Sequence, residues 1–410
     1  MKKWIGISML MVLLVTVIIG MSIQGNMGAD DFTEGSETGE NVTIAPEPDE
    51  ESFADPPGAE PEQVEAVEVS TLKIVSVGDL MFHMPQINAA RGSDGLFDFN
   101  PPFKYVFERI QNADLAIANL ETVIAGDHKG FSGFPRFNSP EAVLDAIAGT
   151  GFDLLVTSNN HSLDGGKEGI INIIDEVTDR GMEYIGTSKD LRRPYVVIDK
   201  NNIKLGILSY TYGLNGLDSL LTREERENMV NLIDRDLIRE DILSVKEEEV
   251  DLVIAYMHWG NEYHSKSSQG QRELAEFLNH NGVDIVLGTH PHVIQEVEYI
   301  SSETKKTLVV YSMGNFISNQ RYDTMGVSAT EDGMLVEIDV VKTLPDGPTY
   351  LSNVKFVPSW IQRVWQGNAY SYRILPVEAA IAGDIDLELD PVTRDRLEKS
   401  LSDTINRLHN

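Results

Sequence analysis

From residue 72 onward, short apolar runs alternate with amphipathic stretches, and this alternation limits the possible folds more than any other feature. Apolar runs of this length are typical of buried strands, and longer amphipathic stretches are typical of helices that cover a sheet. The pattern therefore predicts an α/β fold. The expected strands cover residues 72–77, 115–119, 154–157, 203–210, 252–257, 285–287 and 308–311, and the expected helices cover residues 103–112, 140–148, 166–179, 232–248 and 269–279.

The second half of the chain departs from strict alternation. Residues 334–340 and 352–358 look like strands with no helix between them, so the sheets are expected to be mixed and not purely parallel. Residues 211–231 are polar, and we expect a long loop there that covers one face. A charged amphipathic helix is expected from Asp390 to the end of the chain.

The expected strands end repeatedly in side chains that can bind metals. In open α/β sheets, ligands bind beyond the carboxyl ends of the strands. Each of these residues alone has an ordinary structural explanation, such as a helix cap or a turn. Their recurrence at strand ends makes coincidence a poor explanation. The residues are Asp79, Glu121, Asn160, His161, His258, His290, His292 and Asn315, with His83 four residues past Asp79.

The types of side chain in this set restrict the metal. Imidazoles combined with carboxylates and an amide oxygen suit Zn, Mn or Fe. The chain has no cysteine, which excludes a cysteine–zinc site, disulfides, a thiol nucleophile and a lipoprotein anchor. Two metals need a shared carboxylate and separate terminal ligands. The set holds enough ligands for two divalent ions.

The order of these residues resembles the calcineurin-like metallophosphoesterase pattern. The motifs are more closely similar to those of the CapA family of poly-gamma-glutamate capsule synthesis, over about residues 73–318. They read Gly-Asp-Leu-Met-Phe-His, Asn-Leu-Glu-Thr, Ser-Asn-Asn-His-Ser-Leu-Asp, His-Trp-Gly-Asn-Glu-Tyr, Gly-Thr-His-Pro-His-Val and Tyr-Ser-Met-Gly-Asn-Phe. The resemblance implies a calcineurin-like fold, in which mixed β-sheets pack together and are flanked by helices.

The resemblance also implies roles for the site residues. Asp79 and His292 would bind the first metal, and Asn160, His258 and His290 would bind the second. Glu121 would bridge the two ions. His161 would act as the general acid, oriented by Asp164. Substrate or supporting contacts are expected from Asn119, Trp259, Glu262 and Asn315.

Three positions depart from the phosphoesterase pattern. The usual Asp-x-His start is replaced by Asp79 and, four residues on, His83, which could be a ligand, a substrate contact or neither. Glu121 replaces a bridging Asp, and Asn159 replaces a Gly before Asn-His. These changes are compatible with metal binding but call ordinary phosphoester turnover into question.

The amino-terminal residues predict a membrane anchor. Two lysines precede an uncharged apolar run over residues 5–23, which as a helix is about 28 Å long, close to the thickness of the hydrocarbon layer. This length favours an uncleaved anchor over a cleaved signal peptide. The lysines place the start of the chain inside and the remainder outside. The expected location is therefore the cell membrane, as a single-pass protein with an extracytoplasmic domain.

Charge separates a linker from the folded part. Residues 30–70 hold fourteen acidic and no basic side chains, and such a segment is expected to be a disordered tether. The formal net charge of −32 argues against a nucleic-acid partner. The expected parts are an anchor (1–24), an acidic linker (25–70), a metallophosphoesterase-like domain (71–385) and a charged helical tail (386–410).

The leading hypothesis is a membrane-anchored metal-dependent hydrolase that serves an anionic polymer. The resemblance to the CapA family implies that this polymer is poly-gamma-glutamate or a similar one, and that the protein acts in its synthesis, export or attachment. Subunits of a membrane polymer synthase are the expected protein partners. Two alternatives remain open at the level of sequence. The chain could be a non-catalytic assembly subunit of such a synthase, or a general envelope metallophosphoesterase.

Overall fold

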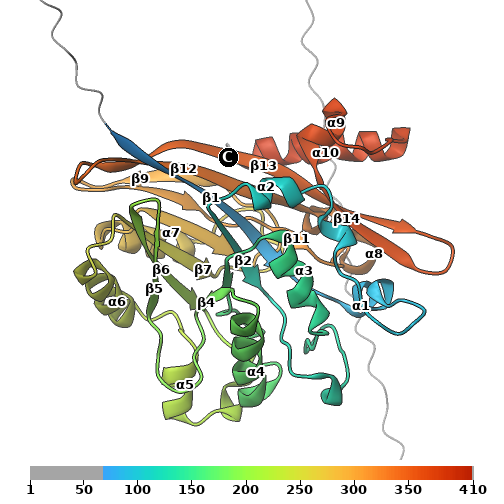
Figure 1. Cartoon of the computed structure of the whole chain (residues 1–410), viewed down its shortest axis with the longest axis horizontal. Coiled ribbons are helices and arrows are strands. Elements are labelled where there is room, and N and C mark those ends of the chain that lie inside the picture. The colour runs from blue at the N-terminus through green and yellow to red at the C-terminus, as the bar shows by residue number, and fades with distance from the viewer. Residues whose placement is uncertain (1–67, 409–410) are drawn as a thin grey trace, which may run out of the picture. The chain divides into compact units, whose positions relative to one another are not determined.

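Two β-sheets pack face to face in the computed structural model, which describes residues 68–408 (Figure 1). The first sheet has the strand order β14-β13-β12-β1-β2-β3-β4, and β11 pairs in addition with β1. Strands β1, β2, β3 and β4 are parallel, whereas β12, β13 and β14 are antiparallel to their neighbours. Their bounds are β1 Val69–Leu80, β2 Leu115–Leu120, β3 Leu154–Val156, β4 Glu183–Ile185, β11 Asn315–Ile317, β12 Asp332–Thr343, β13 Thr349–Trp365 and β14 Tyr370–Pro376.

The second sheet has the strand order β5-β6-β7-β8-β10-β9, with a parallel centre and an antiparallel strand at each edge. Both sheets are therefore mixed, as the sequence predicts. The bounds are β5 Tyr195–Lys200, β6 Ile203–Thr211, β7 Leu252–His258, β8 Ile285–Thr289, β9 Val297–Ser301 and β10 Lys306–Val310.

Alternation of side chains along the strands builds three core layers. On β1, Ile74 belongs to the core between the sheets and Val75 to the core on the outer side of the first sheet. On β7, Ile254 faces the same inner core and Ala255 the outer core of the second sheet. Because neighbouring side chains on a strand point to opposite faces, apolar residues at consecutive positions require cover on both faces.

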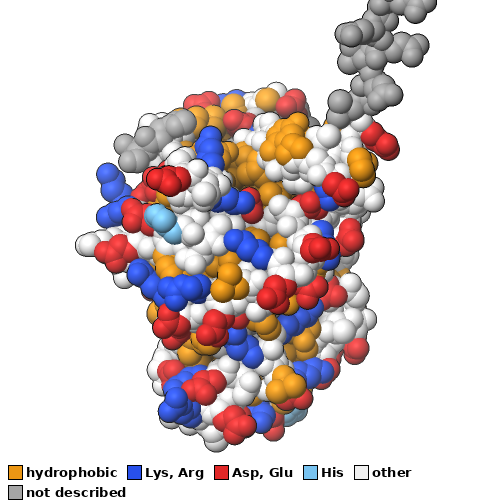
Figure 2. All heavy atoms as spheres, turned by 90° about the vertical axis from the view of Figure 1, so that its left-hand side faces the viewer, with side chains coloured by type: hydrophobic (Ala, Val, Ile, Leu, Met, Phe, Trp, Pro, Cys, Tyr) orange, Lys and Arg blue, Asp and Glu red, His pale blue; other side chains and the backbone are white. Residues whose placement is uncertain are grey.

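Helices provide that outer cover. Helices α2, α3 and α4 pack on the first sheet, α6 and α7 on the second, and α9 and α10 on the end formed by β13 and β14. On the left-hand side of Figure 1, where α6 and β9 lie, basic and acidic side chains are interspersed (Figure 2). The helix bounds are α1 Met84–Ala90, α2 Phe107–Gln111, α3 Ala142–Thr150, α4 Gly166–Asp179, α5 Arg223–Met229, α6 Arg235–Glu247, α7 Gln269–His280, α8 Tyr322–Met325, α9 Val377–Ala382 and α10 Pro391–Leu408.

Two expected elements differ in the structure. Residues 211–231 were expected to be a loop, but they contain a 3-10 turn, Asp218–Leu220, and helix α5. The helix expected over residues 103–112 is divided into a 3-10 turn, Pro101–Phe103, and the short helix α2. The expected anchor and acidic linker lie almost entirely outside the described residues. Within residues 68–408, no helix combines the length and apolar character that a membrane crossing requires.

Candidate metal centre

The carboxyl ends of β1, β2, β3, β7 and β8 place polar side chains at one edge of the packed sheets. Asp79 lies near the end of β1, Glu121 directly follows β2, and His258 ends β7. All three side chains are fully buried. Burial of charged or hydrogen-bonding groups is costly unless they are paired or bind a metal. These buried side chains therefore require hydrogen-bonding partners or a bound metal ion.

The backbone that delivers these side chains is tightly constrained. A Cβ atom at Gly78, just before Asp79, would lie 1.8 Å from the carbonyl oxygen of Gly314, so only glycine allows this approach. His290 and His292 have φ angles of 95° and 58°, in the left-handed region of the backbone that residues other than glycine rarely adopt. Strain of this kind is retained where the surrounding structure enforces it, often at functional sites.

Among residues 68–408, one group that could hold a metal ion consists of Asp79, Glu121 and His292, whose ligand atoms all lie within 4.8 Å of one another. The Nδ1 atom of His292 lies 3.0 Å from Asp79 Oδ2. With its proton on Nδ1, His292 donates a hydrogen bond to this carboxylate, and the lone pair is on Nε2. The Nε2 atom lies 3.8 Å from Glu121 Oε1. Asn119 Nδ2 donates to Asp79 Oδ1 at 2.8 Å and so fixes the carboxylate.

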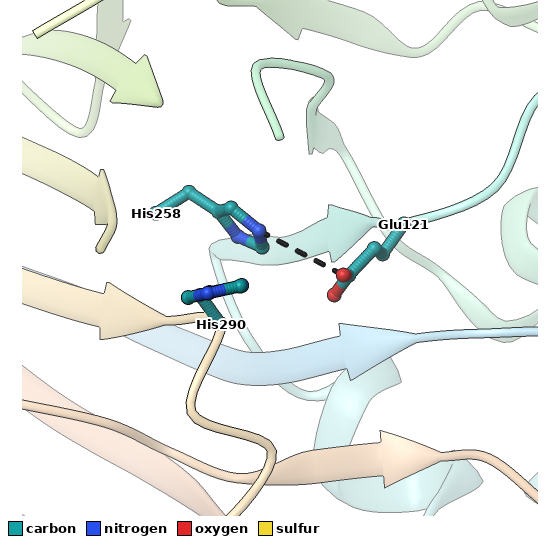
Figure 3. A group of neighbouring side chains, drawn as sticks. All are labelled: Glu121, His258 and His290. Carbon is teal, nitrogen blue, oxygen red and sulfur yellow. Dashed lines mark ion pairs between the residues drawn. The ribbon is translucent and has the colours of Figure 1, made fainter. Parts of the chain in front are cut away.

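A second group shares Glu121 and adds His258 and His290 (Figure 3). The Nε2 atom of His258 lies 3.7 Å from Glu121 Oε1, a separation marked by the dashed line in Figure 3. The same nitrogen lies 2.9 Å from Asn160 Oδ1, which brings the expected amide ligand to this group. Glu121 is thus common to both groups.

The donor atoms fit divalent ions. Glu121 Oε1 and His290 Nδ1 are buried and have no hydrogen-bond partner among the described residues. Burial, followed by the neighbouring His290, lowers the pKa of His258 well below its usual value, and burial lowers the pKa of His290 to about 3. Burial and then Asp79 raise the pKa of Glu121. Because their pKa values are lowered, the imidazoles of His258 and His290 are neutral near pH 7, the state that metal binding requires.

His161 and Asp164 form a separate pair beside these groups. His161 Nδ1 lies 2.7 Å from Asp164 Oδ2, and both side chains are buried. Asp164 Oδ2 also accepts a hydrogen bond of 2.7 Å from the backbone N–H of Phe137. This carboxylate orients the imidazole and leaves Nε2 available for proton transfer.

A family model described as bacterial capsule synthesis protein PGA_cap matches residues 73–320. The chain belongs to this family. Capsule biosynthesis protein CapA of Bacillus anthracis is 27% identical over 277 residues, which cover 65% of this chain and 63% of that protein. PGA biosynthesis protein CapA of Bacillus subtilis (strain 168) is 23% identical over 288 residues, covering 69% and 72%. The match spans less than two thirds of the Bacillus anthracis relative. Together with the family model, these relatives confirm the resemblance to the CapA family.

Solved structures of low sequence identity are also similar in part. One is the NAD nucleotidase NadN of Haemophilus influenzae, with a TM-score of 0.45 and 10% identity, covering 82% of this chain and 63% of that chain. Another is the calcineurin-like phosphoesterase YfkN of Bacillus subtilis, with a TM-score of 0.41 and 15% identity, covering 84% and 100%.

The remaining expected site residues lie in different surroundings. Asn315 Oδ1 lies 3.2 Å from His292 Nδ1, and Asn119 connects Asp79 with Glu121. Trp259 is buried behind the second sheet, where its indole N–H donates to Tyr311 O at 2.9 Å.

His83 belongs to none of the metal-binding groups found among residues 68–408. It caps α1, and its ring contacts Phe137, which also contacts His161. The part that His83 plays in metal or substrate binding stays a prediction.

Three contact residues were missed by the sequence analysis. Thr289 Oγ1 lies 3.0 Å from His258 Nδ1, and Asn215 Oδ1 accepts from Asn160 Nδ2 at 3.2 Å. Tyr212 lies over His290, with ring centres 4.5 Å apart, and burial raises the pKa of its phenol to about 12. Thr289 ends β8, Tyr212 directly follows β6 and Asn215 lies four residues past β6. Their position near these strand ends was the available signal, because those ends face the same edge.

Proposed function

We propose that this chain is a metal-dependent hydrolase with a calcineurin-like arrangement, acting on an anionic capsule polymer of the poly-gamma-glutamate kind. The observation that carries the proposal is the pair of metal-binding groups that share Glu121. A shared carboxylate between two sets of terminal ligands is what a dinuclear site requires. Asp79 and His292 would hold one ion, and Asn160, His258 and His290 the other.

The chemistry follows from the residues around that site. Bound divalent ions supply positive charge that polarises the bond to be cleaved and lowers the pKa of a water molecule. Asp164 accepts the Nδ1 proton of His161, so that His161 presents Nε2 to the leaving group and delivers a proton there. Burial of His161 and Asp164 excludes bulk water from this proton transfer.

The expected topology suits an envelope polymer. An anchor over residues 5–23 and an acidic tether would hold the domain on the extracytoplasmic side of the membrane, next to subunits of a polymer synthase. The names of the relatives in two Bacillus species, which refer to capsule and PGA biosynthesis, support this assignment. In a chain of strong net negative charge, the bound ions would supply local positive charge for a polyanion.

Elemental mass spectrometry of the full chain purified in detergent tests the metal centre. We expect about two Mn, Fe or Zn ions per chain, since two groups share Glu121. The double variant Glu121→Ala/His292→Ala is expected to lose them, because it removes the shared ligand and a terminal ligand. Absence of metal from the wild-type chain, even after reconstitution with these ions, would refute the proposal that the chain is a metal-dependent hydrolase.

Turnover is tested separately with phosphoesters and gamma-glutamyl polymers as substrates. His161→Asn is expected to keep both ions and lose at least a hundredfold in rate, since general acid catalysis contributes about 10²–10⁴. Two bound ions without turnover of either substrate class would favour the non-catalytic assembly role. The replacement of a bridging Asp by Glu121 is the observation that keeps this alternative open.

A further inference from the structure

Glu262 forms a third group with the two histidines of the Gly-Thr-His-Pro-His motif. One carboxylate oxygen of Glu262 and one nitrogen each of His290 and His292 lie within 4.8 Å of one another. In the two-metal assignment, His290 and His292 bind different ions. Glu262 would therefore lie near both ions, although that assignment gives it no ligand role.

The position of Glu262 is set by the backbone. The loop after β7 is pinned to the loop that carries the histidines, because Trp259 N donates to Thr289 O at 3.1 Å and Tyr263 N donates to Pro291 O at 2.8 Å. Gln295, which is fully buried, holds the continuation of the loop by donating to His264 O at 2.8 Å. Tyr263 next to Glu262 has a φ angle of 65°, so the turn is held in an uncommon conformation.

Exposure separates Glu262 from the other carboxylates of the centre. Asp79 and Glu121 are fully buried, whereas Glu262 is exposed. A substrate can approach only from the solvent side, which is the side on which this third carboxylate lies. Glu262 carries a carboxylate, as does each residue of a poly-gamma-glutamate chain through its free α-carboxylate, so the two would compete for the same positive charge.

We propose that Glu262 is an additional, displaceable ligand of the metal centre, which binds on the solvent side of His290 and His292 and gives way to a carboxylate or phosphate oxyanion of the substrate. The proposal rests on the metal centre of the proposed function. The exchange replaces one oxygen ligand by another and breaks no covalent bond. Glu262 would thus fill a ligand position in the absence of substrate, and the oxyanion of the substrate would compete with it for that position.

The test uses the full chain loaded with Mn²⁺, with inorganic phosphate as the probe. Wild type is compared with Glu262→Ala and with Glu273→Ala, a control that removes an exposed carboxylate from α7 and changes the net charge equally. Calorimetry gives the phosphate dissociation constant, water-proton relaxation reports exchangeable water on Mn²⁺, and elemental analysis counts the ions.

We expect Glu262→Ala to keep two ions, to show more exchangeable water and to bind phosphate about tenfold more tightly. A tenfold change corresponds to a carboxylate that blocks the position about nine-tenths of the time. The control should match wild type. Unchanged water relaxation or unchanged phosphate affinity in Glu262→Ala would overturn the proposal, and so would loss of an ion, which would make Glu262 an essential ligand. Absence of metal from wild type would instead refute the metal centre itself.

Discussion

At the scale of single residues, Tyr256 makes a polar contact inside the apolar core between the sheets. Its phenol donates to Val77 O at 2.5 Å and lies 3.4 Å from Ser76 Oγ. Val77 precedes Asp79 by two residues on β1, and Tyr256 precedes His258 by two residues on β7. The contact therefore joins two strands that carry candidate metal ligands in different sheets.

Tyr256→Phe removes this contact and keeps the ring. We expect a loss of about 1–2 kcal/mol in the free energy of unfolding, which is typical of a buried hydrogen bond. We also expect weaker Mn²⁺ binding, because the two strands are no longer held in register across the core. Urea unfolding and calorimetric titration with Mn²⁺ measure the two effects.

Tyr210→Phe is the matched control for this prediction. Tyr210 is equally buried, but its phenol donates to Asp241 on α6 at 2.7 Å and contacts no strand of the first sheet through that bond. We expect the control to lose stability and to keep its Mn²⁺ affinity. Equal Mn²⁺ affinities in the two variants would show that Tyr256 does not position the ligands.

The candidate ligands were easier to recognise in the sequence than the residues that support them. Glu121 and His258 could be recognised because each follows or ends an apolar run, which is a local pattern. The contacts of Thr289 with His258 and of Tyr256 with Val77 join positions that are 31 and 179 residues apart. Such contacts depend on strand order and on how the sheets face each other, and neither is encoded in a local pattern.

At the scale of elements, helix α10 is fastened by a buried ionic contact. Asp332 at the start of β12 accepts from Arg396 at 2.8 Å and from Ser400 Oγ at 2.7 Å. Leu397 between them is fully buried against the cluster that includes Trp360. The carboxylate and the apolar face together fix the helix on β12 and β13.

Asp332→Ala is expected to destabilise the fold by about 1–3 kcal/mol, because it leaves the half-buried Arg396 guanidinium without its closest partner, with Glu331 at 3.7 Å as the remaining acidic neighbour. Asp403→Ala is the control on the same helix. Its pair with Lys399 is largely exposed, and such a pair contributes about 0–1 kcal/mol. Guanidinium unfolding of both variants makes the comparison, and a similar small loss in both would contradict a structural role for the buried contact.

Elements with strong local patterns were predicted, and several elements without such a pattern were not. Strands β4 and β11 have three residues each and exist because neighbouring strands pair with them. Helix α5 was missed although Thr222 and Glu225 form a capping box, a signal that is visible in the sequence. Its single buried residue, Met229, explains why no apolar periodicity accompanied that signal.

At the scale of the whole molecule, each metal would join the two sheets. Asp79, Glu121 and Asn160 follow or lie at the ends of strands in the first sheet, and His258 and His292 come from the second. An ion bound between them adds a link across a boundary that is otherwise held mainly by apolar packing. Because the complete ligand set exists only when both sheets are in place, metal binding favours the folded state over the unfolded one.

This coupling predicts how stability depends on metal. At a free Mn²⁺ concentration a hundredfold above the dissociation constant, each site is expected to add about 2.7 kcal/mol to the free energy of unfolding. Removal of metal with a chelator should lower the urea midpoint of wild type by a corresponding amount. Glu121→Ala/His292→Ala should unfold at the same urea concentration with and without Mn²⁺, since it lacks the shared ligand. A wild-type midpoint that does not respond to Mn²⁺ or chelator would mean that the strand ends do not bind metal across the two sheets.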